Sequence, residues 1–288
     1  MSRKWRRIVR ATISGAGGEL VVEDLRIDFE ATRTIGSKQN TGTVTIWNLS
    51  VANRGKLGEE FDKVKLEAGY AEAQVGVIFS GSIRSVKTSR QGADTASEIE
   101  CGDGDEGINK GAVSKTFPAG TRPREIIEYL RGEMPGVDQG TMVGVDDLPP
   151  VSRPYTVYGW AARELDTLGR TYGFYWSLQN GQLEVVRHDM AINDVTLIST
   201  ETGMIGTPEV TDKGIRVQCL LDPAIAPNRV IDVRSNFLDA SSGRDKRASD
   251  QGGGLFRVSS VTFTGSNRDT QFYCDIEANR IQGGKVVK

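Results

Sequence analysis

The chain has 288 residues, with 36 Lys and Arg against 38 Asp and Glu, which gives a net charge of −2. This length predicts two or three domains, and the near-neutral charge lacks the basic field that nucleic-acid binders usually carry. No apolar run reaches the ~18 residues of a membrane helix, and the basic N-terminus has no apolar core of a secretory signal. The composition is that of an ordinary soluble globular protein whose 34 glycines favour strands and tight turns.

Strands are expected throughout residues 1–112. Leu25, Ile27 and Phe29 alternate with Arg26 and Asp28, the pattern of a half-buried strand. A short helix or turn is predicted over residues 51–61, a loop over residues 31–42, and a bulge near Gly81. The run of short strands predicts an antiparallel barrel or sandwich. The predicted strands lie around residues 8–13, 19–29, 43–47, 64–68, 77–86 and 95–101.

The acidic segment after the last of these strands contains a G-x-G-x-x-G pattern, Gly102, Gly104 and Gly107. A dinucleotide site needs a βαβ unit and free amides, whereas three carboxylates here would repel phosphates, so we expect a solvated acidic turn. A calcium-hand loop is rejected because Gly107 and Ser114 stand where ligands are needed. A looser cation site at Asp103 and Asp105 stays open. The three carboxylates are those of Asp103, Asp105 and Glu106.

A small α+β domain is predicted over residues 113–195. Thr121 can cap a first helix with Ile126, Ile127 and Leu130 on its apolar face. A loop follows over residues 137–154. A second helix has apolar residues spaced 4, 3 and 4 apart, ends at Gly173, and leads into a hairpin turning at Asn180-Gly181. The second helix face comprises Ala161, Leu165, Leu168 and Tyr172.

Aromatic residues are concentrated in this insert. An exposed sugar-binding platform is one interpretation, but core packing is favoured because several fit buried faces. They are Trp160, Tyr172, Phe174, Tyr175 and Trp176.

Residues 196–288 return to strands around 215–217, 230–233, 255–263 and 270–278. Between them lies the polar loop Leu238–Gly254. We expect this loop to be mobile in the free chain and ordered after assembly, because it lacks apolar groups to offset its ordering entropy. The loop Ala31–Gly42 would be its counterpart.

The two β regions have similar landmarks in the same order. VTIWNL (44–49) aligns with IRVQCL (215–220), VKLEA (64–68) with VIDVR (230–234), and IFSGSIRSV (78–86) with LFRVSSVTF (255–263). This predicts a duplicated β domain interrupted by the insert; convergent strand patterning is the alternative.

Three cysteines and one histidine limit catalytic and metal chemistry. Cys101, Cys219 and Cys274 are widely spaced, odd in number and set in apolar stretches, so we expect buried free thiols and no zinc site. His188 stands alone, which excludes His-cluster metal sites and leaves any Ser-His-Asp triad dependent on one imidazole. The nucleophile-elbow and phosphate-loop motifs are missing. We therefore expect no catalytic residues, no cofactor and no metal ligand.

Basic residues without acids crowd the N-terminus around Trp5. They could touch nucleic acid, but a solvated or partner-facing terminus fits the near-neutral chain better. They are Arg3, Lys4, Arg6, Arg7 and Arg10.

The chain resembles the baseplate hub proteins of long-tailed, contractile bacteriophages of the Mu-like and T4-like kind. The resemblance rests on TGTVTIWNLS, VKLEAGY, VIFSGSIRSV and the D-T-ASEIECGDG segment in that order. The insert and the closing segments GLFRVSSVTFTG and FYCDIEANR support it. It implies a mainly β fold with two tail-tube-like antiparallel domains, residues 1–112 and 196–288, flanking an insert domain, residues 113–195.

The resemblance implies a non-enzymatic homotrimer in the virion tail, assembled in the bacterial host cytoplasm. Its partners would be the sixfold tail tube, the threefold central spike and other baseplate proteins, with no membrane and no specific nucleic acid. Two rival hypotheses are a tail-associated peptidoglycan hydrolase using carboxylates and a nucleic-acid-binding β-barrel module. No segment is left over for a lysozyme domain, and the net charge counts against nucleic acid.

Overall fold

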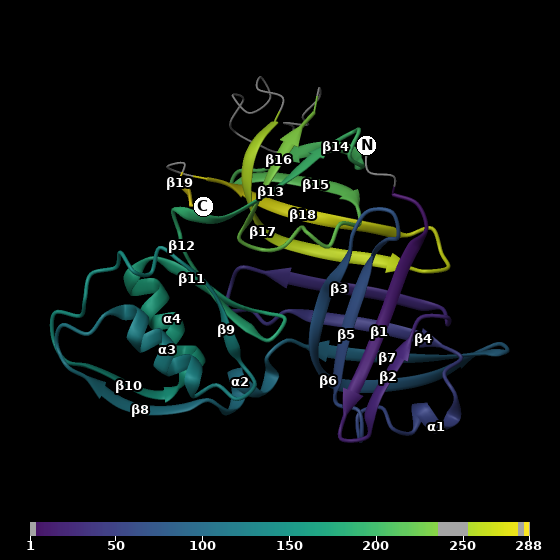
Figure 1. Cartoon of the computed structure of the whole chain (residues 1–288), viewed down its shortest axis with the longest axis horizontal. Coiled ribbons are helices and arrows are strands. Elements are labelled where there is room, and N and C mark those ends of the chain that lie inside the picture. Colours follow the sequence, from purple (N-terminus) through teal and green to yellow (C-terminus); the bar gives the residue numbers. More distant parts are fainter. Residues whose placement is uncertain (1–3, 236–252, 282–284, 288) are drawn as a thin grey trace. The chain divides into compact units, whose positions relative to one another are not determined.

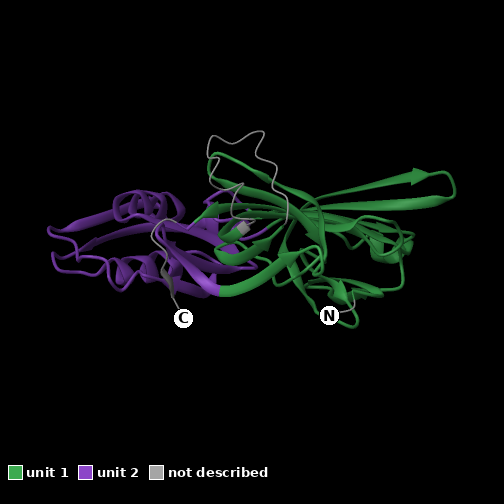
Figure 2. Cartoon of the chain, turned by 90° about the horizontal axis from the view of Figure 1, so that it is seen from above, with its two compact units in different colours: residues 1–33, 40–102, 194–280 green, residues 34–39, 103–193, 281–288 purple. Residues whose placement is uncertain are grey.

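The computed structural model describes residues 4–235, 253–281 and 285–287. The chain forms two compact units, coloured green and purple in Figure 2. Unit 1 comprises residues 1–33, 40–102 and 194–280, and unit 2 comprises residues 34–39, 103–193 and 281–288. Both β regions therefore lie in unit 1. Among the described residues, no helix has the length and apolarity to cross a bilayer.

The first β region of unit 1 contains seven strands and one short helix (Figure 1). Ser50 caps the helix, its hydroxyl accepting a 3.2 Å hydrogen bond from the backbone N–H of Asn53. The elements are β1 (Arg7–Gly15), β2 (Gly18–Val22), β3 (Ile27–Thr34), β4 (Thr41–Trp47), α1 (Val51–Arg54), β5 (Lys63–Tyr70), β6 (Val75–Gln91) and β7 (Asp94–Gly102).

The second β region repeats the strand order of the first. Its elements are β13 (Met190–Ser199), β14 (Met204–Val210), β15 (Gly214–Leu220), β16 (Arg229–Arg234), β17 (Gly253–Ser266) and β18 (Phe272–Arg280). The first region is ordered β3-β4-β7-β6-β5-β1, and the second is ordered β14-β15-β18-β17-β16-β13. The strands matched from sequence occupy equivalent places, although the sequence registers are one or two residues off. The strand orders support duplication, and the boundaries at residues 112 and 196 stay a proposal.

One hydrophobic core serves both β regions. Strand β3 pairs with β17, so all these strands belong to one large sheet. Along β3, Ile27, Phe29 and Ala31 are buried between less buried neighbours, the alternation expected of a strand with one face in the core. Phe263 and Phe272 enter the same core from the second region. Shared burial explains why the two regions form a single compact unit.

Unit 2 contains three helices and two small sheets. The helices are α2 (Asp105–Lys110), α3 (Pro123–Gly132) and α4 (Ala161–Tyr172). A two-stranded sheet pairs β8 (Ala112–Phe117) with β10 (Tyr155–Trp160), and a three-stranded sheet has the order β11 (Phe174–Gln179), β12 (Gln182–Arg187), β9 (Asp138–Val143). The last described strand, β19 (Lys285–Val287), pairs in parallel with the start of β13.

Helices α3 and α4 and the hairpin of the insert agree with the sequence prediction, whereas α2 forms in the segment that was expected to be an acidic turn. Ile126, Ile127 and Leu130 are fully buried on α3. Gly173 ends α4 with φ of 74°, a left-handed conformation that glycine adopts without steric cost. Asn180 and Gly181, at φ of 54° and 81°, form the turn between β11 and β12, as a two-residue hairpin requires.

Several details differ from the prediction. Arg122, and not Thr121, is the N-cap of α3, because the Thr121 hydroxyl donates to the carbonyl of Pro118 at 2.8 Å. Residues 137–154 are not all loop, since β9 pairs with β12 and satisfies its backbone there. Strand β3 extends to Thr34, which shortens the predicted 31–42 loop. The expected bulge near Gly81 corresponds to two register shifts, one on each side of it.

Most of the predicted loop Leu238–Gly254 lies outside the described residues. Its last two glycines already belong to β17. Its behaviour on assembly therefore stays a prediction.

Candidate assembly interface

A polar site of unit 1 lies along the seam where β3 meets β17. The side-chain oxygens of Thr32 and Thr262 lie 3.0 Å apart across it. At its other end, the backbone N–H of Asn267 donates to the carbonyl of Ile27 at 3.2 Å. The register pairs residues whose numbers sum to 294 at both ends, so the two strands run antiparallel over this stretch. The seam thus joins the two β regions by strand pairing.

The turn after β17 is held onto the first residue of β3 and the segment just before it. The side-chain amide of Asn267 donates to the carbonyl of Leu25 at 2.7 Å and accepts from the N–H of Ile27 at 2.9 Å. Ser266 organises the turn itself, because its hydroxyl accepts from the backbone N–H groups of Arg268 and Asp269 at 3.1 Å each. Asn267 therefore continues the seam where regular pairing stops.

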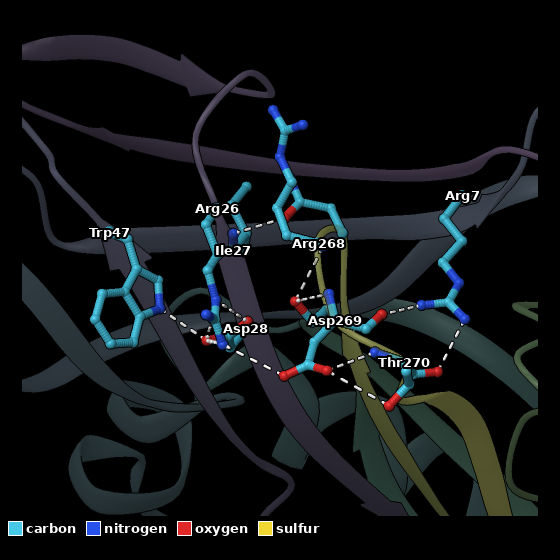
Figure 3. Close-up of polar contacts among 10 residues, drawn as sticks. Arg7, Arg26, Ile27, Asp28, Trp47, Arg268, Asp269 and Thr270 are labelled. Atoms are coloured by element: carbon cyan, nitrogen blue, oxygen red, sulfur yellow. Dashed lines mark hydrogen bonds and ion pairs between the residues drawn. The ribbon is translucent and has the colours of Figure 1, made fainter. Parts of the chain in front are cut away.

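Asp28 is the centre of a charged cluster beside this turn (Figure 3). Its carboxylate accepts from the Trp47 indole at 2.7 Å and from the Arg26 guanidinium at 3.0 and 3.1 Å. Burial raises the pKa of Asp28, but hydrogen bonds from Arg26, Ser266 and Trp47 outweigh that cost, so the pKa lies below its usual value. Arg26 also lies 4.9 Å from the centre of the Trp47 ring and 3.6 Å from Asp269. The cluster therefore links β3, β4 and the turn.

Arg7 connects β1 to the same turn. Its guanidinium donates to the carbonyls of Asp269 and Thr270, the latter at 2.9 Å, and lies 5.1 Å from the centre of the Phe272 ring. The rings of Tyr70 and Phe272 meet edge to face at 5.3 Å. Burial raises the pKa of Tyr70 to about 12, which keeps its hydroxyl neutral.

The N-terminal basic residues are less solvated than the sequence suggested. Lys4 lies 3.6 Å from the carboxylate of Asp222, and Arg10 pairs with Glu23 and Glu67. Lys4 and Arg10 thus find counter-charges within unit 1, and strand pairing brings Glu23 and Glu67 beside Arg10, whereas Arg7 donates to backbone carbonyls. Trp5 is 68% exposed, and Arg3 lies outside the described residues.

A cavity of about 750 Å³ in unit 1 lies beside Tyr70. Its walls include Leu197, Leu221 and Pro223 as well as charged side chains. In the described part of the chain, no three His, Cys, Asp or Glu side chains gather closely enough to hold a metal ion.

The acidic glycine motif is a structural element of unit 2. Asp103 is only 1% exposed, and its carboxylate accepts hydrogen bonds from the N–H groups of Asn180 and Gly181 at 2.7 and 2.8 Å. The expectation of a solvated acidic turn is therefore wrong for Asp103, because the β11–β12 turn covers it. Asp105 begins helix α2 and accepts from Gln39. Gly104, at φ of 68°, is needed because a Cβ there would lie 2.0 Å from the Leu178 side chain.

The three cysteines and His188 pack against other parts of the chain. The thiols of Cys101, Cys219 and Cys274 are free and buried, as expected. The His188 ring packs on Tyr175 with ring centres 4.0 Å apart.

The insert aromatics divide between core and surface. Phe174 and Trp176 are buried, which confirms core packing for them, whereas Trp160 is 51% exposed. Trp160 and the still more exposed Tyr158 lie on the outer face of β10 opposite Ala112 and Ser114, which are too small to cover them.

The seam residues were not singled out from the sequence. The only local signal is the Ser-Asn-Arg-Asp sequence of residues 266–269, between the predicted strands 255–263 and 270–278, which forms a turn in the structure. Nothing in the spacing connects that turn to Asp28 or Arg7, which lie more than 230 residues away along the chain.

Comparison with known proteins agrees with this architecture. The family described as "Baseplate hub gp41" matches residues 8–278. No curated protein matches the sequence.

Solved structures share the fold at low identity. The 43 kDa tail protein of prophage MuSo2 from Shewanella oneidensis has a TM-score of 0.63 at 10% identity, covering 96% of this chain and 97% of its own. A tail protein from Neisseria meningitidis MC58 gives 0.63 at 8%, with coverage of 96% and 97%. The E. coli c3393 protein, a type VI secretion component described as similar to T4 tail proteins gp27 and gp5, gives 0.61 at 12%, with coverage of 96% and 75%.

Proposed function

We propose, from the premise that the chain belongs to the baseplate hub gp41 family, that it is a homotrimeric adaptor between the tail tube and the central spike. Membership of this family makes the chain a structural component of a phage tail and so of the virion. The trimer, its place between tube and spike, and its contacts with other baseplate proteins are the proposal. Assembly from subunits in the host cytoplasm belongs to it as well.

The observation that carries the proposal is the repeated strand order in unit 1. A sixfold tube and a threefold spike have different symmetries, so an adaptor must present six similar surfaces from three chains. Two β regions with one strand order, joined through the β3–β17 seam, supply two such surfaces per chain. Closed rings of identical chains are the usual form of such assemblies.

The mass of the purified protein tests the trimer. Light scattering should give three copies of the 31.3 kDa chain, about 94 kDa, and electron micrographs should show rings with six similar lobes. Purified tube protein and spike protein of the same phage should each bind the ring. A monomer at every concentration, or a ring with another number of copies, would contradict the proposal.

The proposal is of a structural protein and not of a cell-wall hydrolase. Family membership supports this, since the family is described by its place in the baseplate. A clearing assay on bacterial cell walls checks it. Clearing that disappears when one Asp or Glu is replaced would establish the rival function.

A further inference from the structure

We propose that the outer edge of β6, residues 85–91, pairs antiparallel with β14 of a second copy of this chain, in the register in which β17 pairs with β3 within one chain. The partner is thus the chain itself, bound head to tail through two different edges. This inference rests on the proposed homo-oligomeric hub and specifies which strands close it.

The first step is that the β6–β7 strand pair and the β17–β18 strand pair have equivalent registers, so their residues can be matched one to one. Ser82 faces Gly102, and the register shifts between Ile83 and Ser85. In the second region Arg257 faces Asn279, and the register shifts between Val258 and Ser260. In both strand pairs, the bulge thus begins directly after the residue that follows Ser82 or Arg257. Ser85 therefore corresponds to Ser260, and Lys87 corresponds to Thr262.

The same comparison makes β14 the equivalent of β3. Thr41 of β4 and Gly214 of β15 face the equivalent residues Gly102 and Asn279. Thr32 pairs with Thr41, and the N–H of Thr211 donates to the carbonyl of Gly214 at 3.0 Å. Thr211 is therefore the counterpart of Thr32.

Within one chain, this type of strand pairing occurs once, between β17 and β3. The equivalent strands β6 and β14 do not pair with each other in the described chain. In the first seam, β17 pairs with β16 up to Arg257 and then with β3 along the same edge. Strand β6 likewise pairs with β5 up to Ser82. From Ser85 to Gln91, β7 is its only strand neighbour in the described chain, and β14 ends the sheet with β15 as its only one.

The exposed edge of β6 is long, regular and basic. Residues 85–91 span roughly 23 Å at ~3.3 Å per residue, and Figure 1 shows the β6–β7 hairpin extending beyond the rest of the sheet. Such an edge presents unpaired backbone groups that recruit another strand, unless bulges, prolines, charged side chains or cover prevent it. The basic side chains of this edge disfavour a like-charged partner and leave an edge that carries acids as the fitting one. Its bulge lies at the start, at residue 84, and leaves the following stretch regular.

Charge also fits the two edges to each other. Residues 82–91 carry Arg84, Lys87 and Arg90 and no acid, while Glu209 and Asp212 lie at the end of β14 and in the turn after it. The inferred register places Lys87 beside Thr211 of the next copy and Ser89 beside its Glu209. Bases on one edge and acids near the other favour their association, while the register itself follows from the equivalence with the first seam. Since each copy offers two unlike edges, the contact is heterologous and produces a ring when the rotation closes.

Cysteine cross-linking tests the register. In a K87C/T211C double variant, mild oxidation should convert most of the protein into covalent multimers on a non-reducing gel. A mixture of the single variants K87C and T211C should give dimers, and neither alone should. The S89C/E209C pair should link in the same way, which covers loss of the Thr211 turn contact with Gly214. The native thiols are buried and do not interfere.

Two matched control variants test the register of the pairing. T32C/T262C, the same pair within one chain, should form an intramolecular disulfide. T88C/T211C should link poorly, because adjacent residues of a strand point to opposite faces. Dimers from K87C alone, or equal linking by T88C, would overturn the inferred register.

Mass measurement separates this inference from the proposed function. If the wild-type protein is a trimer, T32C/T262C closes, and neither intermolecular pair links, the β6–β14 pairing is wrong while the trimeric hub stands. If the protein is monomeric at every concentration, the trimer and the pairing are both overturned.

Discussion

Asn267 and Ile27 exchange two hydrogen bonds across the seam between the β regions. The backbone N–H of Asn267 donates to the carbonyl of Ile27 at 3.2 Å, and its side-chain carbonyl accepts from the N–H of Ile27 at 2.9 Å. Ile27 is fully buried, so water cannot readily replace these bonds. One side chain thus completes the pairing of segments 240 residues apart.

Replacing Asn267 should therefore weaken unit 1. We expect N267A to lower the free energy of unfolding by about 1–3 kcal/mol, because it leaves the buried N–H of Ile27 and the carbonyl of Leu25 without a partner. Urea denaturation followed by tryptophan fluorescence measures this. R268A is the matched control, since its exposed side chain makes one bond to the Asp24 carbonyl. Equal effects of the two variants would contradict the role of Asn267.

Asp28 should make stability depend on acid pH. Its folded-state pKa is lowered, so its contribution is present above the unfolded value of ~3.9 and disappears as pH falls through the folded value. D28N should be less stable than wild type at neutral pH, and the difference should shrink at progressively lower pH. Urea midpoints at several pH values measure it. A difference that is constant across the acid range would exclude the ionised carboxylate as the cause.

Tyr70 should make stability depend on alkaline pH. Its folded-state pKa is raised to about 12, so the stabilisation is fully present below the unfolded value of ~10 and disappears as pH rises towards 12. Ultraviolet titration of the folded protein should show a tyrosine with a midpoint near 12 that Y70F lacks. If Y70F leaves that part of the titration curve unchanged, another residue is responsible.

Asp103 should stabilise unit 2 without binding a cation. We expect D103A to lower the free energy of unfolding by about 2–3 kcal/mol, because a buried carboxylate that accepts two backbone N–H groups is lost. E106A, in the exposed pair with Lys110, should cost less than about 1 kcal/mol. Addition of Ca²⁺ or Mg²⁺ should leave the melting temperature of the wild type unchanged. A rise that D103A or D105A abolishes would restore the cation site.

The three thiols should react only when the fold opens. Cys101, Cys219 and Cys274 are buried, and burial raises the pKa of Cys274, so its reactive thiolate is scarce. A thiol reagent should label few sites in the native protein and three in denaturant. Rapid labelling of the native protein would show that β15 and β18, where Cys219 faces Cys274, separate readily.

Local elements of the insert could be predicted because their signals are local. The 4-3-4 spacing through Leu165 and Leu168 is sufficient to define the buried face of α4. Asn180-Gly181 specifies its own turn, since both residues accept positive φ. The strands of the β regions were also predicted from alternation, and their common order was expected from matched segments. Strand β9 was missed because its parallel pairing with β12 provides the order that its own polar sequence does not.

The sequence by itself determined many of the strands, the helices α3 and α4, and the family that the chain resembles. Only the tertiary structure decided how polar residues are used. Thr32 and Thr262 are ordinary strand threonines until the chain brings them together from 230 residues apart. Asp103 belongs to an acidic motif that looks solvated until the β11–β12 turn covers it. Apolar periodicity is imposed residue by residue along the chain, whereas the partner of a hydrogen bond is fixed by strand order, which depends on the whole core.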